Sequence, residues 1–149
     1  MKIYALRNGF SSIELVVVLA LVGIITAIAL PNWRSWMPGY ALNSSTRQIQ
    51  SELHNIKMRA AAENTSFQLA YLQDASEYTI ERDSKPLQAK PLAPGTSITK
   101  AGIISFSPRG TAGSNRVRLR NSNNSCRQIV VSATGRVRIC MPSSCSEDC

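Results

Sequence analysis

The sequence is poor in the side chains that most enzymes use for acid–base chemistry. Its 149 residues include a single histidine, His54, and nine Asp and Glu residues that are scattered along the chain. It contains no glycine-rich phosphate-binding motif, and its serines and cysteines lie in no nucleophile motif with a base partner. We therefore expect a protein that is not an enzyme and needs no cofactor, and that binds or assembles instead.

Negative charge is absent from a long part of the second half. Between Ser84 and Ser146 there is no Asp or Glu, while the same 63 residues contain ten Lys and Arg, and the whole chain has a net charge of +8. Such a one-signed region is typical of a protein that binds a polyanion. The alternative is a solvated basic face that aids solubility or docks on an acidic neighbour.

Charge is also missing from residues 15–30, where Thr26 is the only hydroxyl-bearing side chain. Residues 10–30 contain one charged side chain, Glu14, and a helix of this length spans about 30 Å, the thickness of a bilayer core. An unpaired carboxylate there costs roughly 2–3 kcal/mol or more. We therefore expect the segment to pack against other subunits, whose amino termini neutralise Glu14; the alternative is a signal anchor with an accidental glutamate.

The residues before this apolar segment read R-N-G-F-S-S-I-E, with Gly9 followed by Phe10. This junction resembles the leader of type IV prepilins, in which an inner-membrane peptidase cuts after the glycine and methylates the new terminus. The resemblance implies a mature protein that starts at Phe10, uses Glu14 in assembly, and has the prepilin peptidase, the inner membrane and other pilins as partners. An ordinary secretory signal is instead cut after its apolar region.

The pattern along the chain predicts an α+β fold. The prepilin resemblance implies that this fold is pilin-like, in which a long N-terminal helix with a transmembrane lower half packs on a small antiparallel β-sheet head. We expect a leader at 1–9, a transmembrane or filament-core helix at 10–36, an amphipathic helix at 37–64 and a β-rich head at 65–149. Pro38-Gly39 is expected to kink or break the helix. Apolar residues then recur at helical spacing: Leu42, Ile49, Leu53, Ile56 and Ala60.

Short aromatic and β-branched segments predict the strands of the head. They lie at residues 67–72, 78–81, 97–99, 103–107, 116–120, 126–132 and 136–140. Residues 85–95 contain three prolines and are expected to form a loop.

All four cysteines lie near the C-terminus: Cys126, Cys140, Cys145 and Cys149. An exported head favours disulfides, and the absence of a C-x-x-C pair argues against zinc, the alternative. Three pairings are possible. A two-residue turn at Thr134-Gly135 would place Cys126 and Cys140 on opposite faces, which favours the pairs 126–145 and 140–149, although one bulge reverses this parity.

Basic side chains alternate with aliphatic ones in two predicted strands. The alternation places Arg116, Arg118 and Arg120 on one face of the first strand, and Arg136 and Arg138 on one face of the second. Guanidinium groups suit phosphate oxygens. Arg109 and Lys100, near turns, extend this predicted patch. If the two strands share a sheet, like charges oppose each other, and a polyanion relieves that repulsion.

Three segments, I-S-F-S-P-R-G, R-V-R-L-R-N and I-V-V-S-A-T-G-R-V-R, resemble the minor pilins and pseudopilins grouped as FimT, FimU and GspH. The run from Gly135 to Arg138 matches the G-R-x-R motif of FimT-like pilins, which is linked to DNA uptake in natural transformation. The match is strongest with FimT, and it implies that Gly135, Arg136 and Arg138 belong to a DNA-contact site.

The resemblance therefore implies a minor type IV pilin that binds the phosphate backbone of double-stranded DNA without sequence preference. It implies an inner-membrane protein with a periplasmic head before assembly, and a location on the pilus or cell surface afterwards. Two other functions fit the same residues. One is a structural minor pilin of the pilus tip or priming complex without a ligand, and the other is a pseudopilin of type II secretion.

Overall fold

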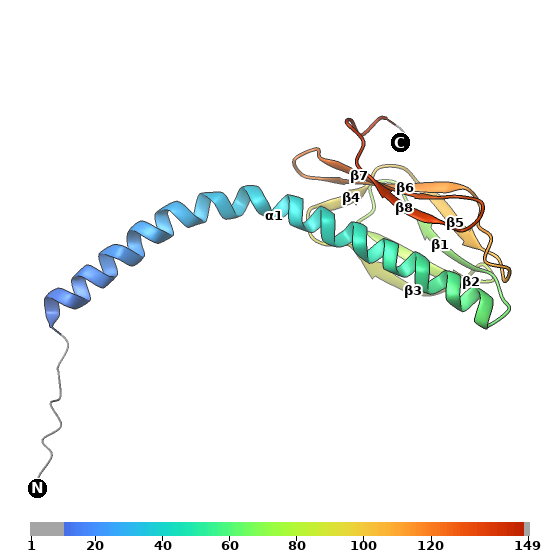
Figure 1. The fold of residues 1–149 in the computed structure, drawn as a ribbon, viewed down its shortest axis with the longest axis horizontal. Helices are drawn as coiled ribbons and strands as arrows, with labels where there is room; N and C mark the ends of the chain where they lie inside the picture. Colours follow the sequence, from blue (N-terminus) through green and yellow to red (C-terminus); the bar gives the residue numbers. More distant parts are fainter. Residues whose placement is uncertain (1–10, 148–149) are drawn as a thin grey trace, which may run out of the picture. The chain divides into compact units, whose positions relative to one another are not determined.

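The computed structural model describes the backbone of residues 11–147 and the side chains of residues 11–29 and 36–147. Within that range, one long helix, α1 (Ser12–Ala62), precedes eight strands (Figure 1). The chain divides into two compact units, Met1–Trp36 and Met37–Cys149. Helix α1 contributes to both units, and each unit is described in turn.

The first unit contains the apolar part of α1. Residues Ser12–Ala29 form a helical segment with a mean hydropathy of 2.6, long and apolar enough to cross a membrane. Its large aliphatic side chains are exposed, which suits a helix whose surroundings are lipid or other subunits. Glu14 lies in the first turn of α1, where a carboxylate interacts favourably with the helix dipole.

The expected break at Pro38-Gly39 is wrong, because α1 continues without interruption through both residues. A proline inside a helix removes one N–H donor and costs about 3 kcal/mol. The helix beyond this point is stabilised by an apolar stripe that packs on the head, and this packing outweighs the local cost.

That stripe is confirmed. Its five predicted residues are at most 3% exposed: Leu42, Ile49, Leu53, Ile56 and Ala60. They share one hydrophobic core with apolar side chains of the strands, among them Phe67, Phe106 and Ile129. Figure 1 shows this part of α1 running along the strands. Beside the apolar stripe, the buried carboxylate of Glu52 pairs with the Lys90 ammonium at 2.6 Å. The negative charge of Glu52 is therefore not buried without a partner.

The strands of the head are antiparallel, as predicted, and they form two four-stranded sheets. The first sheet has the order β3-β2-β1-β5 and the second the order β4-β6-β7-β8. The strands of the first sheet are β1 (Phe67–Tyr71), β2 (Glu77–Arg82), β3 (Lys85–Pro91) and β5 (Gly102–Phe106). The strands of the second sheet are β4 (Thr96–Ile98), β6 (Asn115–Asn121), β7 (Cys126–Val131) and β8 (Val137–Cys140).

Strand β3 corrects the prediction of a loop at residues 85–95. It pairs only with β2, along a register that shifts between Ile80 and Glu81. Proline cannot donate a hydrogen bond within a sheet, but an edge strand leaves alternate N–H groups unpaired and therefore tolerates it. Pro86 and Pro91 are compatible with a strand here because β3 is an edge.

Tyr71 connects the two sheets. Its hydroxyl donates a hydrogen bond to the backbone carbonyl of Arg116 in β6 at 3.0 Å, and burial raises the pKa of this hydroxyl to about 12. Gly102 makes room for the ring, because a Cβ atom there would lie 2.7 Å from the Tyr71 hydroxyl oxygen. The strand that carries three of the predicted arginines is thus held to the first sheet.

Candidate functional site

Strands β6 and β8 place the predicted arginines by alternation. Val117 and Leu119 of β6 are fully buried and Val137 of β8 is 9% exposed, so these side chains face the core. Arg116 and Arg138, which alternate with them, are exposed on the opposite side of the sheet. We call this side the outer face. The division into inner aliphatic and outer basic side chains is as predicted.

Strand β7 separates β6 from β8, the two strands that carry outward-facing arginines. In the register of the second sheet, Val130 stands between Arg116 and Arg138. Their Cα atoms are about 10 Å apart, since neighbouring strands lie about 4.8 Å apart. The direct opposition of like charges considered from the sequence therefore does not arise. Arg136, just before β8, is also exposed, and these three residues form what we call the outer arginine surface.

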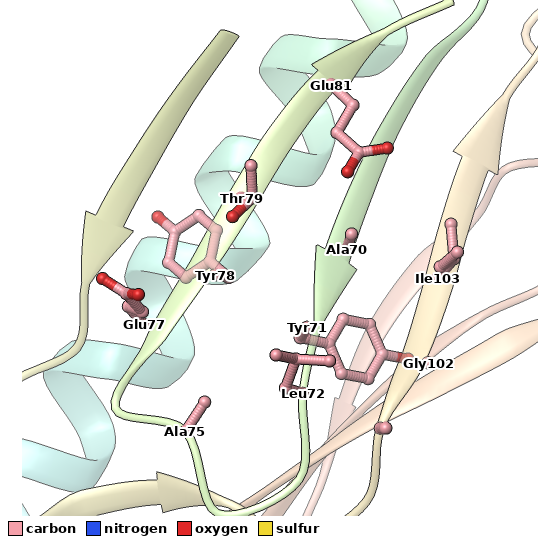
Figure 2. A pocket seen from close by; sticks show the side chains of 11 residues that line it. Ala70, Tyr71, Leu72, Ala75, Glu77, Tyr78, Thr79, Glu81, Gly102 and Ile103 are labelled. Atoms are coloured by element: carbon pink, nitrogen blue, oxygen red, sulfur yellow. The ribbon is translucent and has the colours of Figure 1, made fainter. Parts of the chain in front are cut away.

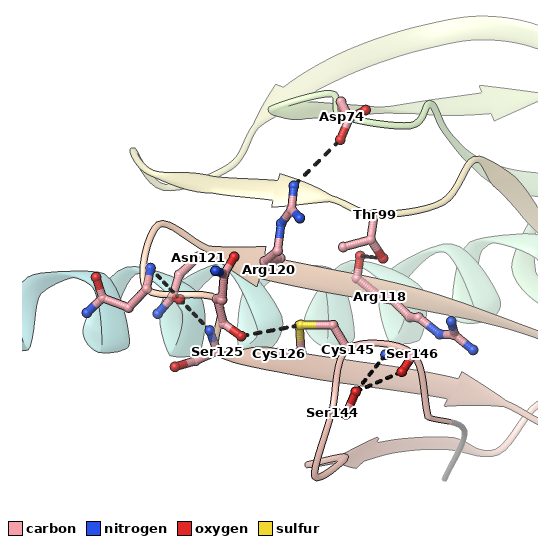
Figure 3. The surroundings of a disulfide bond; sticks show 12 residues. Asp74, Thr99, Arg118, Arg120, Asn121, Ser125, Cys126, Ser144, Cys145 and Ser146 are labelled. Atoms are coloured by element: carbon pink, nitrogen blue, oxygen red, sulfur yellow. Dashed lines mark hydrogen bonds and ion pairs between the residues drawn. A yellow bond between two sulfur atoms is a disulfide. The ribbon is translucent and has the colours of Figure 1, made fainter.

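The C-terminal tail covers the middle of the outer face. Gln128 stands between Arg118 and Cys140 in register, and it is fully buried although it faces away from the core. Cys126, two residues earlier on the same face, is disulfide-bonded to Cys145 of the tail (Figure 3). The tail therefore lies over this row, and Arg118 is only partly exposed.

The bridge between Cys126 and Cys145 confirms one of the two predicted pairs, and its Cα atoms are 5.3 Å apart. Two of the four thiols are therefore not available for zinc. Cys140 is also disulfide-bonded, and its predicted partner, Cys149, lies outside the described residues.

The parity argument that favoured this pairing is wrong. The Ser132 N–H donates to the Arg136 carbonyl at 3.0 Å, which leaves a loop of three residues rather than two. Gly135 ends the loop with a φ of 72°, the left-handed conformation that closes such a hairpin. The additional residue places Cys126 and Cys140 on the same face, so the pairing does not follow from opposite faces.

Two other predicted cations are Arg120, which lies in β6, and Lys100. Arg120 is exposed and forms an ion pair with Asp74 at 3.9 Å (Figure 3), which partly neutralises its charge although such an exposed pair adds little stability. Lys100 is exposed in the turn between β4 and β5. It follows Thr99, whose N–H donates to the Arg118 carbonyl at 3.0 Å.

Arg109 lies on the loop between β5 and β6, and the structure brings this loop against the turn between β7 and β8. A Cβ atom on Gly135 would overlap the carbonyl oxygen of Gly110. Arg109 and Arg136, which are the sequence neighbours of these two glycines, are both exposed. The loop arginine therefore joins the same end of the head as the G-R-x-R motif.

Lys57 of α1 makes a contact that the sequence did not predict. Its ammonium group donates a hydrogen bond to the backbone carbonyl of Gly135 at 2.9 Å, in partly buried surroundings. A signal was present, because Lys57 lies four residues after Leu53 and three before Ala60. Residues at these spacings share a helix face, so Lys57 flanks the stripe that packs on the strands.

Two hollows on the head lie apart from the outer arginine surface. Arg127 pairs with the buried Leu119, so it faces inward and, with Arg47 of α1, lines a groove of about 670 Å³. The other hollow, of about 510 Å³, lies on the first sheet, where its lining includes Glu77 and Glu81 and no basic residue (Figure 2).

Of the residues predicted for processing and assembly, the structure describes only Glu14. Gly9 and Phe10 lie outside the described residues. Glu14, predicted to act in assembly, is exposed near the start of α1.

Residues 29–135 match the family model described as type II transport protein GspH. No curated protein sequence matches the chain. The fold is similar to that of the type IV minor pilin FimU from Pseudomonas aeruginosa strain PAO1, with a TM-score of 0.56 and 17% identity over 70% of this chain and 99% of that one.

A second crystal form of FimU gives a TM-score of 0.55 at 15% identity, over 70% of this chain and 94% of that one. The minor pseudopilin EpsH from the type 2 secretion system of Vibrio cholerae gives 0.54 at 12% identity, over 68% of this chain and 99% of that one. At these identities the likenesses show the fold alone.

Proposed function

This chain belongs to the GspH family and is a minor pilin or pseudopilin of the GspH/FimU type, and from that premise we propose that its head binds double-stranded DNA without sequence preference. The apolar helix and the pilin fold fit a protein anchored in the membrane with a periplasmic head. We propose further that it is most like FimT and acts in DNA uptake during natural transformation.

One observation carries the proposal. Arg116, Arg136 and Arg138 are exposed together on the outer face of the second sheet, in a region of 63 residues that has no acidic side chain. Planar guanidinium groups pair well with phosphate oxygens. The G-R-x-R motif supplies two of these three residues, so the sequence resemblance and the geometry favour the same surface.

The mechanism follows from this arrangement. Arginines that neutralise phosphates release condensed counterions, and this release drives binding that does not depend on sequence. Few contacts per head give weak binding, with a Kd of about 10⁻⁴–10⁻⁶ M, the range of non-specific complexes at physiological salt. Several subunits in one pilus, or fast retraction after capture, would make such binding useful.

The proposed role is binding rather than catalysis. His54, the one histidine in the sequence, is exposed on α1, and α1 packs on the strands through its other face. The aromatic side chains of the strands, Phe67, Tyr71, Tyr78 and Phe106, are buried in the core and are not available for stacking on bases. Backbone contact with a duplex therefore suits this head better than recognition of single strands.

A structural role in the pilus tip or priming complex, or in type II secretion, is the alternative. The similarity of the fold to both FimU and EpsH favours neither pilus nor secretion system. In each of these roles the partners are other pilins and the basic face binds no nucleic acid. DNA binding by the isolated head therefore separates the proposal from the alternative.

The decisive experiment uses the soluble fragment 37–149. This unit contains every residue of the hydrophobic core, so we expect it to fold without the anchor. In a mobility-shift or anisotropy titration it should bind unrelated duplexes equally. The plot of log K against log[salt] should have a slope of roughly −3 to −5 if about four or five phosphates are engaged. A fragment that binds no duplex even at low salt would leave the structural role as the function.

A further inference from the structure

Lys57 is the one helix residue whose side chain is hydrogen-bonded to the turn of the G-R-x-R motif among the contacts of the described residues. It reaches from α1 to the Gly135 carbonyl, 78 positions later in the sequence, at 2.9 Å. The contact holds the backbone rather than a side chain. It therefore fixes where the turn lies relative to the helix, whichever rotamers the neighbouring arginines adopt.

The same lysine lies beside a second loop. A Cβ atom on Gly110 would lie 3.5 Å from Cε of Lys57, and one on Gly135 would lie 3.1 Å from that atom. Both glycines have positive φ, 77° and 72°, so both loops bend sharply where they meet the lysine. The two loops also bond to each other, because the Ala112 N–H donates to the Ala133 carbonyl at 3.0 Å.

We infer that Lys57 is a positioning residue of the DNA-binding surface, which clamps loops 107–113 and 132–136 to α1 so that Arg109 and Arg136 contact phosphates as one unit. This inference rests on the proposed function. The two arginines are exposed and each is adjacent to one of the clamped glycines. Arg109 thereby adds a fourth cation beside the outer arginine surface, although it comes from a different loop.

The physical benefit of the clamp is preorganisation. A loop or long side chain that is mobile before binding must be ordered when it binds, and that ordering reduces the affinity. Two loops held to a helix that is itself packed on the core lose less freedom on binding. The lysine ammonium is partly buried against backbone, so it acts on the phosphates through the arginines rather than by touching them.

The test uses the full-length protein in detergent micelles and a fluorescent duplex of mixed sequence. Lys57→Met keeps the length of the side chain but removes the donor, and it should weaken binding roughly three- to tenfold, the range expected when one or two groups lose preorganisation. Lys57→Arg keeps a long donor and should retain most of the affinity. Lys85→Met, which removes the same charge from exposed strand β3, is the matched control and should change binding less than twofold.

A double-mutant cycle separates positioning from direct contact. In a protein that already carries Arg109→Gln and Arg136→Gln, Lys57→Met should weaken binding no further, because the residues through which it acts are gone. An additive loss would mean that Lys57 contacts phosphate itself, which overturns the positioning role. A lower thermal midpoint with unchanged affinity would overturn it too, since the lysine would then only stabilise the fold.

Hydrogen exchange tests the clamp without DNA. Peptides that cover residues 107–113 and 132–136 should exchange faster in Lys57→Met than in wild type, and as slowly as wild type in Lys57→Arg. Unchanged exchange in Lys57→Met overturns the clamp. Failure of the wild-type protein to bind the duplex is a different result: it overturns the proposed function and the positioning role together, while the exchange data still decide whether the loops are clamped.

Discussion

Arg116 and Arg138 flank Val130 in register across the adjacent strands β6, β7 and β8, so the guanidinium groups of two different strands share one outer face. The spacing comes from β7, which carries an aliphatic residue at this position and keeps the like charges from direct opposition. A duplex lying across the strands can therefore meet one arginine from β6 and others from the β8 side without bending around the head.

Replacing both arginines of the G-R-x-R motif should nearly abolish DNA binding. In fragment 37–149, Arg136→Gln with Arg138→Gln removes two exposed charges and leaves the buried Val137 and the turn glycine in place. The slope of log K against log[salt] should become less negative by about two, one for each lost phosphate contact. Circular dichroism should show an unchanged fold. In cells, the full-length double mutant should assemble pili and lose DNA uptake.

The control for this experiment must remove the same charge elsewhere. Lys57 is unsuitable because its ammonium group donates a hydrogen bond to the Gly135 carbonyl. Arg47→Gln with Lys85→Gln changes two exposed residues on α1 and β3, away from the outer face, and should leave binding almost unchanged. If the motif variant binds as tightly as this control, the site is wrongly assigned.

Reduction should destabilise the head. The bridge from Cys126 to Cys145 closes a loop with a sequence separation of 19, and a disulfide of this kind contributes about 2–4 kcal/mol. Thermal unfolding of fragment 37–149 should therefore begin at a clearly lower temperature with reductant than without it. Peptide mapping should recover the 126–145 pair from periplasmic protein, and recovery of a 126–140 peptide would contradict the structure.

Local patterns predicted the elements of this fold better than their assembly. The apolar stripe from Leu42 to Ala60 and the alternation around Val117 and Leu119 depend on the period of one helix or strand, and both are found. The division into two sheets depends on which distant strands pair, and no local pattern records that. Strand β3 was missed because its prolines favoured a loop. Proline is excluded from central strands but not from an edge strand, and the sequence does not show that β3 lies at an edge.

The candidate site was predicted only in part for the same reason. Exposure of Arg116, Arg136 and Arg138 follows from alternation. The partial cover over Arg118 depends on where a disulfide directs the tail, and the pairing of Arg120 with Asp74 depends on contact between the two sheets. A turn one residue longer than expected reversed the parity of β8 relative to β7, which shows how strongly cross-strand predictions depend on turn length.

Processing of the N-terminus is expected at the Gly9-Phe10 junction. The motif that precedes the apolar helix resembles the prepilin leader, and Glu14 stands in the first turn of that helix. Intact-mass measurement of membrane-extracted protein should give a chain that starts at Phe10 and carries one methyl group. A chain that retains Met1, or one that starts after residue 30, would contradict a pilin that keeps its apolar helix.

Stability at high pH should report on the Tyr71 contact to β6. At neutral pH, Tyr71→Phe should destabilise fragment 37–149 by about 1 kcal/mol, because the Arg116 carbonyl loses its donor. Burial raises the pKa of Tyr71 from 10.0 to about 12. As the pH rises, the hydroxyl therefore loses its proton in the unfolded chain before it does so in the folded one. The stability that the protonated hydroxyl contributes is complete below pH 10 and is lost as the pH rises towards 12. Urea unfolding at pH 7, 9 and 11 should therefore show the wild-type advantage over Tyr71→Phe shrinking at the highest pH. The other tyrosines titrate in both proteins and cancel in this comparison. A difference that stays constant across these three values would mean that the hydroxyl is not buried against Arg116 in solution.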